Sequence, residues 1–167
     1  MRRWAGAAAA AVVGTSTLTG CGVPPGGIVG VTVDAQGQPL IVVQMCEGHI
    51  DGASMYLRDP RPEPETPEDK AMGRWEVTPA VAGFSQFTLT AGENGWRLIG
   101  TLARRDPATR YTIYGWTHDS SWSASHVEFA EQDLARLQLG TVWVGTDNER
   151  HIESLTDFRT KTCEHWM

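Results

Sequence analysis

Residues 28–46 read IVGVTV-DAQGQP-LIVVQMC, two apolar runs on either side of six polar or turn-forming residues. The β-branched side chains in both runs fit the pleated surface of a strand. Gly37 and Pro39 favour a turn between them, because glycine tolerates unusual backbone angles and proline fixes one. The pattern therefore predicts a β-hairpin with strands over 28–33 and 40–46.

Further strand-like segments follow the hairpin, separated by turn-forming residues. Residues 111–116, YTIYGW, alternate in a way that favours a strand with one aromatic face. Asn94-Gly95 favours a tight turn, which would make 84–103 a second hairpin. Besides the first hairpin, strands are expected over 53–57, 74–78, 84–90, 96–103, 110–116 and 140–144.

One short helix is expected over 130–137, with acidic residues near its start and Gly140 just beyond its end. Seven or eight short strands with this helix predict a mainly β domain. The expected fold is an antiparallel β-sandwich or an open barrel with one short helix near the C-terminal third. Residues 59–69 hold four prolines and five acidic residues, so we expect an exposed loop there.

The overall composition is that of an ordinary globular domain. The 167 residues are 41% hydrophobic and 20% charged, with a formal net charge of −6. These values exclude a disordered chain, a disulfide-dense miniprotein and a protein that crosses a membrane several times. A nucleic-acid partner is not expected either, because no basic surplus is available to neutralise phosphates.

The N-terminus has the parts of an export signal: Arg2 and Arg3, then an apolar run over 5–13. That run is too short to span a bilayer, which needs about 20 apolar residues. The signal ends in Leu-Thr-Gly-Cys at residues 18–21, which resembles a bacterial lipobox. The resemblance implies that the Cys21 thiol receives diacylglycerol and that the chain is cut before Cys21. The alternative is an ordinary secretory signal with Cys21 as a plain thiol, and the export route, general or twin-arginine, stays open.

The lipobox divides the chain into three parts. Residues 1–20 are expected to be a lipoprotein signal peptide, residues 21–27 a lipidated cysteine with a Pro/Gly tether, and residues 28–167 a single extracytoplasmic domain. Loss of Arg2 and Arg3 leaves twelve Lys and Arg against twenty Asp and Glu, a formal −8. Two acyl chains hold a protein on a membrane stably. The expected location is therefore the extracytoplasmic face of the cell membrane, through a lipid anchor.

The three cysteines divide into one for the lipid and two others, Cys46 and Cys163. Outside the cytoplasm these two can oxidise, so we expect a Cys46–Cys163 disulfide that joins a strand end to the C-terminal tail. A zinc site with His165 is the alternative, but no paired ligand spacing supports it. We expect no metal site: the acidic segment 63–69 also lacks the spacing of a calcium loop.

Catalytic motifs are missing from the sequence. His126-x-Glu128 and His151-x-Glu153 each place two polar side chains on one side of a strand, but such pairs are common by chance. The sequence has no Gly-x-Ser-x-Gly elbow, no Ser-x-x-Lys pair and no phosphate-binding glycine loop. A cofactor is not expected, and binding is favoured over catalysis.

The candidate binding residues lie in residues 114–123, YGWTHDSSWS. Trp116 and Trp122 bracket a polar loop with His118 and Asp119, and an exposed aromatic pair can stack on sugar rings or anchor a protein partner. In the alternative reading, Trp116 fills the interior of the domain and Trp122 covers its end.

Several segments after Gly95 carry a resemblance to a known group. They are GWRLIGTL from residue 95, YTIYGWT from 111, HVEF from 126, DLARL from 133 and GTVW from 140, with Phe158 before Cys163. Together with the lipobox they resemble uncharacterised lipoproteins of actinobacteria. The resemblance implies location and fold but no chemistry.

The sequence thus favours a membrane-anchored lipoprotein that acts as a binding or interaction module, with a protein or glycan partner in the cell envelope. One alternative is a hydrolase that acts on envelope material, with acid and base residues around Asp119 and His126. The other is a purely structural envelope domain.

Overall fold

The computed structural model describes residues 22–58, 71–90, 92–146 and 149–166. Cys21 and the loop expected over 59–69 lie outside these ranges. The elements within them are β1 (Pro25–Val33), β2 (Pro39–Met45), β3 (Ile50–Leu57), β4 (Ala71–Val81), β5 (Phe84–Thr88), β6 (Trp96–Ile99), β7 (Arg110–Trp116), β8 (Ser123–Ala130), α1 (Glu131–Leu134), β9 (Thr141–Val144), β10 (His151–Ser154), α2 (Leu155–Lys161) and the 3-10 helix η2 (Thr162–His165).

The first hairpin is confirmed. Strands β1 and β2 pair antiparallel, from Val33 opposite Pro39 to Gly27 opposite Met45. The turn is closed by the Asp34 carboxylate, which accepts the backbone N–H groups of Gln36 and Gln38 at 2.8 Å each. A short aspartate side chain that binds backbone two residues on is a usual way to fix such a turn.

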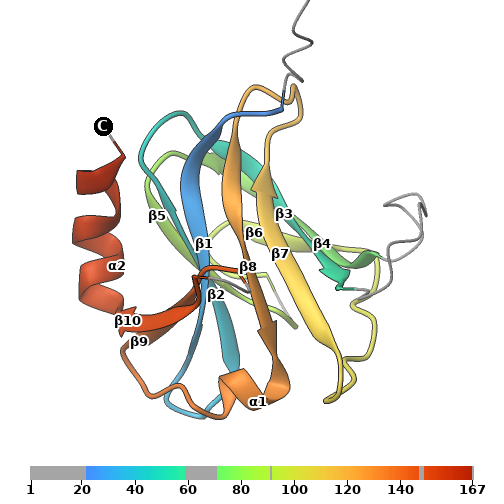
Figure 1. The fold of residues 1–167 in the computed structure, drawn as a ribbon. Coiled ribbons are helices and arrows are strands. Elements are labelled where there is room, and N and C mark those ends of the chain that lie inside the picture. Colours follow the sequence, from blue (N-terminus) through green and yellow to red (C-terminus); the bar gives the residue numbers. More distant parts are fainter. Residues whose placement is uncertain (1–21, 59–70, 91, 147–148, 167) are drawn as a thin grey trace, which may run out of the picture.

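The strands form one strongly curved sheet that nearly closes into a barrel (Figure 1). Its order is β10-β9-β1-β8-β7-β3-β4-β6, and β2 pairs with β1 and β5. The end strands β5 and β6 meet through side chains: the Trp96 ring stacks on Phe87 with centroids 4.2 Å apart, and its Nε1 donates to Ser85 Oγ at 2.8 Å. The expected fold class, a mainly β domain, is confirmed. Of the two expected forms, sandwich or open barrel, the sheet corresponds to the open barrel.

The second hairpin expected over 84–103 is wrong. Strand β5 pairs with β2, and β6 pairs with β4. Asn94 and Gly95 do form a turn, with φ of 55° and 87°. The turn joins the two ends of the curved sheet, so its flanking strands contact each other through Phe87 and Trp96 and not through a ladder of backbone hydrogen bonds.

The sheet also contains one parallel pairing that the sequence did not suggest. The first residues of β1 run parallel to β8, with Ile28 opposite Ser125, and β1 then pairs antiparallel with β9. Strand β1 already begins at Pro25. Residues 25–27, which were expected to belong to the tether, are therefore part of the sheet.

The core fills the curved sheet and extends under the C-terminal helix. The largest fully buried side chains include Trp75, Phe87, Tyr111, Phe129 and Phe158. Phe158 belongs to a smaller cluster with Val42, Val142 and Val144, through which α2 packs against the outside of the sheet.

Helical structure in the C-terminal third falls in two places. The expected helix over 130–137 is a single turn, α1. At its N-terminus the Asp133 carboxylate accepts the Ala130 N–H at 2.9 Å. The second helix, α2, was not expected, and it begins at a Ser154 cap that accepts the Asp157 N–H. In the described ranges no helix has the length and apolar character needed to cross a membrane.

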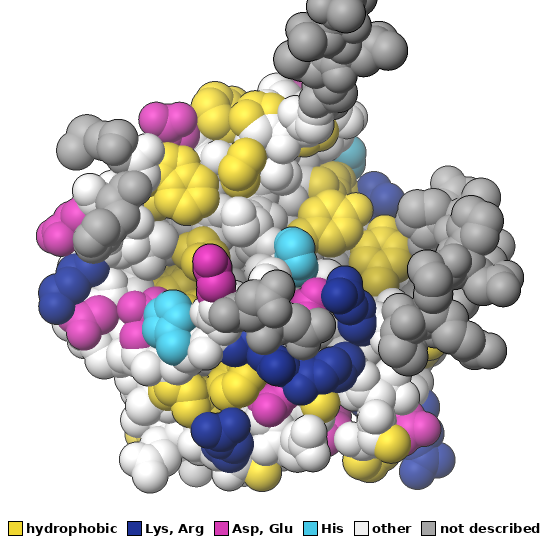
Figure 2. All heavy atoms as spheres, viewed as in Figure 1, with side chains coloured by type: hydrophobic (Ala, Val, Ile, Leu, Met, Phe, Trp, Pro, Cys, Tyr) yellow, Lys and Arg dark blue, Asp and Glu magenta, His cyan; other side chains and the backbone are white. Residues whose placement is uncertain are grey.

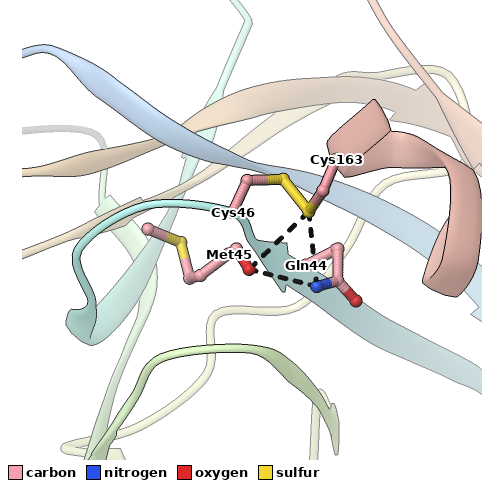
Figure 3. Close-up of a disulfide and its surroundings, with 4 residues drawn as sticks. All are labelled: Gln44, Met45, Cys46 and Cys163. Carbon is pink, nitrogen blue, oxygen red and sulfur yellow. Dashed lines mark hydrogen bonds between the residues drawn. A yellow bond between two sulfur atoms is a disulfide. The ribbon is translucent and has the colours of Figure 1, made fainter. Parts of the chain in front are cut away.

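The expected disulfide between Cys46 and Cys163 is confirmed (Figure 3). It joins the residue after β2 to η2, with Cα atoms 5.2 Å apart. Gln44 supports this junction: its Nε2 donates to the Met45 carbonyl at 3.0 Å and lies 3.7 Å from Cys163 Sγ. Both sulfurs are therefore used in the bridge, which removes the thiolates that a zinc site would need. The His165 side chain lies outside the described part of the chain.

Candidate functional site

The outer face of β3 and β7 carries a row of half-buried aromatic side chains. The register places Tyr56 opposite Thr112, and Ser54 opposite Tyr114. Tyr111 and Ile113 point inward and are fully buried, whereas Tyr114 alternates with them and remains half-buried. The YTIYGW segment therefore forms a strand with different inner and outer faces, as its alternation predicted.

Trp116 belongs to this outer row. Its ring lies across Gly52, so close that a Cβ on that glycine would lie 2.4 Å from the indole. Its Nε1 donates to Ser54 Oγ at 2.9 Å, and the Arg74 guanidinium lies 4.2 Å from the ring centroid. Contacts on two sides and at the nitrogen hold the indole in one orientation on the surface of the sheet.

Tyr56 and Tyr114 stack on each other beside Trp116. Their ring centroids are 5.8 Å apart and their planes differ by 16°. Burial and the hydrogen bond with Tyr56 raise the pKa of Tyr114 from 10.0 to about 12. The Tyr114 hydroxyl is therefore neutral at physiological pH and can both donate and accept a hydrogen bond.

A hollow of about 340 Å³ lies next to Tyr114, between β7, β8 and the start of the chain's described part. Polar groups with hydroxyl or imidazole chemistry line one part of it, and apolar groups line the rest. The lining residues are Val23, Pro25, Thr112, Tyr114, Ser123, Ala124, Ser125 and His126. A hollow with one aromatic wall and several hydroxyl donors suits a polar, neutral ligand with an apolar face.

His126, of the His126-x-Glu128 pair, lines this hollow. Glu128 is 1% exposed, and its Oε1 lies 3.1 Å from Arg58 Nη1 and 3.8 Å from His126 Nε2. A buried carboxylate needs such a counter-ion, because burial disfavours its charge. Among the described residues, no three His, Cys, Asp or Glu side chains come together as metal ligands. His126 is thus a member of the hollow, and Glu128 is committed to Arg58.

The second pair, His151-x-Glu153, lies elsewhere. It is on β10, where His151 is exposed and its Nδ1 lies 3.3 Å from the Glu149 carbonyl. Burial raises the pKa of the Glu153 carboxyl above its usual value. In the sheet order, β10 is separated from β7 and β3 by β9, β1 and β8.

Of the loop's expected binding residues, Trp116 and His118 lie in the aromatic row, and Asp119 lies in the turn beside it. His118 meets the Trp116 ring edge-on, with centroids 5.2 Å apart, and its backbone N–H donates to Asp51 Oδ2 at 2.9 Å. Asp119 is fully exposed and shapes the turn: its carboxylate accepts the Ser121 N–H at 3.0 Å. Hydrogen bonds from Ser121 and then Thr117 lower the pKa of Asp119 from 3.8 to about 2.

Trp122 lies apart from the aromatic row. Its ring covers Gly48 and Gly26, where an added Cβ would lie 2.5 Å and 2.8 Å from it. The Gly26 carbonyl in turn accepts the backbone N–H of Cys46 at 2.7 Å. Trp122 therefore packs over the segment next to the disulfide.

Sequence reasoning missed Tyr56, Arg74 and the hollow beside Tyr114. Tyr114 belonged to the quoted segment, but its partner lies on β3, and only the register of β3 against β7 brings the two rings together. The alternation of residues 111–116 was the available signal, since it places Tyr114 and Trp116 on one face.

Comparisons of the chain with protein-family models, with curated proteins and with solved structures find no match.

Proposed function

We propose that the protein is a lipid-anchored binding module on the extracytoplasmic face of the cell membrane, and that the outer face of β3 and β7 binds a glycan of the cell envelope. The observation that carries this proposal is the stacked Tyr56–Tyr114 pair, which borders a hydroxyl-lined hollow of about 340 Å³.

The chemistry of this face suits a sugar ring. One side of such a ring presents C–H groups, which pack on an aromatic face because contact removes apolar surface from water. The other edges carry hydroxyls, which need partners once water is displaced. Thr112, Ser125 and His126 line the hollow and can supply them. A neutral Tyr114 hydroxyl can donate to or accept from the same ligand.

The proposed anchor agrees with the position of the hollow. Val23 and Pro25 line it, and Val23 follows the proposed lipidation site, Cys21, by only two residues. A ligand in the hollow would therefore be held close to the membrane surface, where envelope glycans are attached or assembled.

The geometry favours binding over hydrolysis at this face. A hydrolase of the expected kind would use Asp119 and His126 as acid and base. With a pKa of about 2, Asp119 is ionised at neutral pH, so it has no proton to donate, and it is also a weak general base because its affinity for a proton is low. Glu128 is buried and paired with Arg58, and Asp51 accepts the His118 N–H at 2.9 Å. A purely structural domain predicts no ligand for the hollow, and the binding assay separates this alternative from the proposal.

A binding assay with matched variants tests the proposal. Purified protein is titrated with soluble fragments of the envelope polysaccharides, and binding is followed by calorimetry. Tyr114→Ala removes one wall of the hollow and should lower the affinity at least tenfold, whereas Tyr114→Phe keeps the ring and should lose less. Phe84→Ala is the matched control, because Phe84 is a half-buried aromatic residue on β5 that packs with the cluster under α2. Equal losses in Tyr114→Ala and Phe84→Ala, or no binding of any fragment, would overturn the proposal.

A further inference from the structure

A second pocket, of about 470 Å³, lies between α1, the start of β7 and β10. Its lining includes Arg110, Asp133, Arg136, Trp143, Arg150 and His151. It shares no lining residue with the hollow beside Tyr114. The pocket is therefore a separate site from the proposed glycan site.

The pocket is cationic on an acidic protein. Three arginines and a histidine line it against one carboxylate, Asp133, while the chain as a whole carries a formal −6. That carboxylate is already used, since it accepts the Ala130 N–H at 2.9 Å and lies 3.6 Å from Arg110 Nη1. Figure 2 shows Lys and Arg side chains gathered on this face, near the position of α1 in Figure 1. With Asp133 already used, the lining favours an anion through Arg110 and Arg136.

Trp143 forms a fixed support for two of the guanidinium groups. Its ring is 5% exposed, and its Nε1 donates to the Glu128 carbonyl at 2.9 Å. The guanidinium carbons of Arg136 and Arg150 lie 5.6 Å and 6.0 Å from the ring centroid, within the range of a cation–π contact. Stacking on a fixed ring limits the orientations of both guanidinium heads, which are held at the pocket in this way.

Arg110 adds a donor that needs a partner. Its Nη1 is buried and makes no hydrogen bond, since the 3.6 Å to Asp133 is too long for one. A buried donor without an acceptor costs free energy, so a site of this kind favours a ligand that supplies an oxygen. Arg136 adds a cation, because it makes no ion pair within the part of the chain that is described and lies over the Trp143 ring.

We propose that this pocket binds the phosphate group of a small soluble ligand. One guanidinium fork satisfies a carboxylate by itself, whereas several forks around one pocket match the greater number of oxygens and the second charge of a phosphate. The pocket lies at the α1 end of the sheet, and the chain enters β1 at the opposite end (Figure 1). If the proposed anchor is present, the pocket faces away from the membrane, which favours a soluble phosphate over a lipid headgroup of the same membrane.

Calorimetry with inorganic phosphate on the purified full chain tests this site. Arg136→Gln should weaken phosphate binding about tenfold, since a charge-assisted hydrogen bond is lost. Arg97→Gln is the matched control: it makes the same charge change on β6, where Arg97 pairs only with Glu76 on the surface in the described part, and it should leave phosphate affinity unchanged. Both variants should keep the wild-type thermal midpoint, and both should keep wild-type glycan binding.

Further ligands distinguish a soluble phosphate from a carboxylate and from a lipid headgroup. Glycerol phosphate should bind with a similar dependence on Arg136, and acetate should bind more weakly than phosphate. Equal losses in Arg136→Gln and Arg97→Gln would mean that only overall charge matters, and this result would overturn the proposal. If Arg136→Gln and Arg97→Gln differ in binding to phosphatidylglycerol vesicles but not in binding to soluble phosphates, the proposal is also overturned. The same holds if the wild type does not bind phosphate.

Discussion

The Arg74 guanidinium lies 4.2 Å from the centroid of the Trp116 ring, on the outer face of the sheet. Gly52 supports the Trp116 ring from the sheet, so the indole lies between a glycine and a guanidinium. Arg74 is exposed, but stacking limits the orientations of its planar head and presents its N–H donors beside the Tyr56–Tyr114 pair. In this arrangement Trp116 positions a cation for a ligand and is less available as a stacking surface itself.

Arg74→Ala should therefore weaken glycan binding more than it weakens the fold. The loss of the cation–π contact should lower the free energy of unfolding by about 0.5–1 kcal/mol. Affinity should fall severalfold, because donors beside the stacked tyrosines are lost. Arg74→Lys keeps the charge without the planar fork and should show intermediate binding. Urea denaturation and calorimetry measure the two effects, and unchanged affinity in both variants would show that Arg74 takes no part in binding.

Trp122→Ala should weaken the fold and leave glycan binding unchanged. The ring covers Gly48 and Gly26 next to the disulfide, so its removal opens a gap in half-buried packing. We expect a loss of about 2–3 kcal/mol in the free energy of unfolding, somewhat below the cost of a fully buried aromatic residue. Glycan affinity of the folded fraction should not change. A variant with wild-type stability and weakened binding would instead place Trp122 in the binding site.

These contrasts show what the sequence alone could predict. The hairpin over 28–46 depends on a local turn, and Asp34 fixes that turn within four residues. The pairing of β5 with β2 and of β6 with β4 depends on the closure of the whole sheet, in which Phe87 and Trp96 meet from opposite ends. Local turn chemistry at Asn94 was recognised, but it carries no information about which strands form the ladder.

The candidate site divides in the same way. Trp116 and His118 are near neighbours in the chain, and a polar loop between aromatic residues was enough to single them out. The Tyr56–Tyr114 stack needed the register of two strands that are distant in sequence. Helix α2 escaped prediction because only Phe158 in its seven residues is buried, so no apolar periodicity marks it.

Removal of the disulfide should cost more stability than any single surface change. The bridge closes a loop with a sequence separation of 117, for which the chain-entropy model gives about 4–5 kcal/mol. The double variant Cys46→Ser/Cys163→Ser should lose a large part of this value in urea denaturation. Non-reducing peptide mapping of the wild type should recover Cys46 joined to Cys163. Wild-type protein with reductant is the control, and identical unfolding with and without reductant would contradict a stabilising bridge.

Asp119 gives a prediction for acid pH. Its pKa is lowered from 3.8 to about 2, first by Ser121, so the folded state binds this proton less readily than the unfolded state. The carboxylate therefore stabilises the fold above about pH 4, and this contribution is lost as the pH falls towards 2. A carboxyl NMR titration should give a midpoint near 2, and Ser121→Ala should move it upward. A wild-type midpoint near 3.8 would show that the turn does not hold the carboxylate as described.

The lipid anchor is tested most directly at Cys21. If the thiol carries diacylglycerol, Cys21→Ala removes both the thioether and the cut site, so the protein should leave the membrane fraction or remain as an unprocessed precursor. Cys21→Ser is the stricter control, because the hydroxyl keeps the size of the side chain but is a weaker nucleophile than a thiolate. Mass spectrometry of the wild type should show a chain that begins at Cys21 with added lipid. Since two acyl chains hold a protein on a bilayer far more firmly than one, the wild type should stay bound in high salt, and its release by salt would instead indicate attachment through charge.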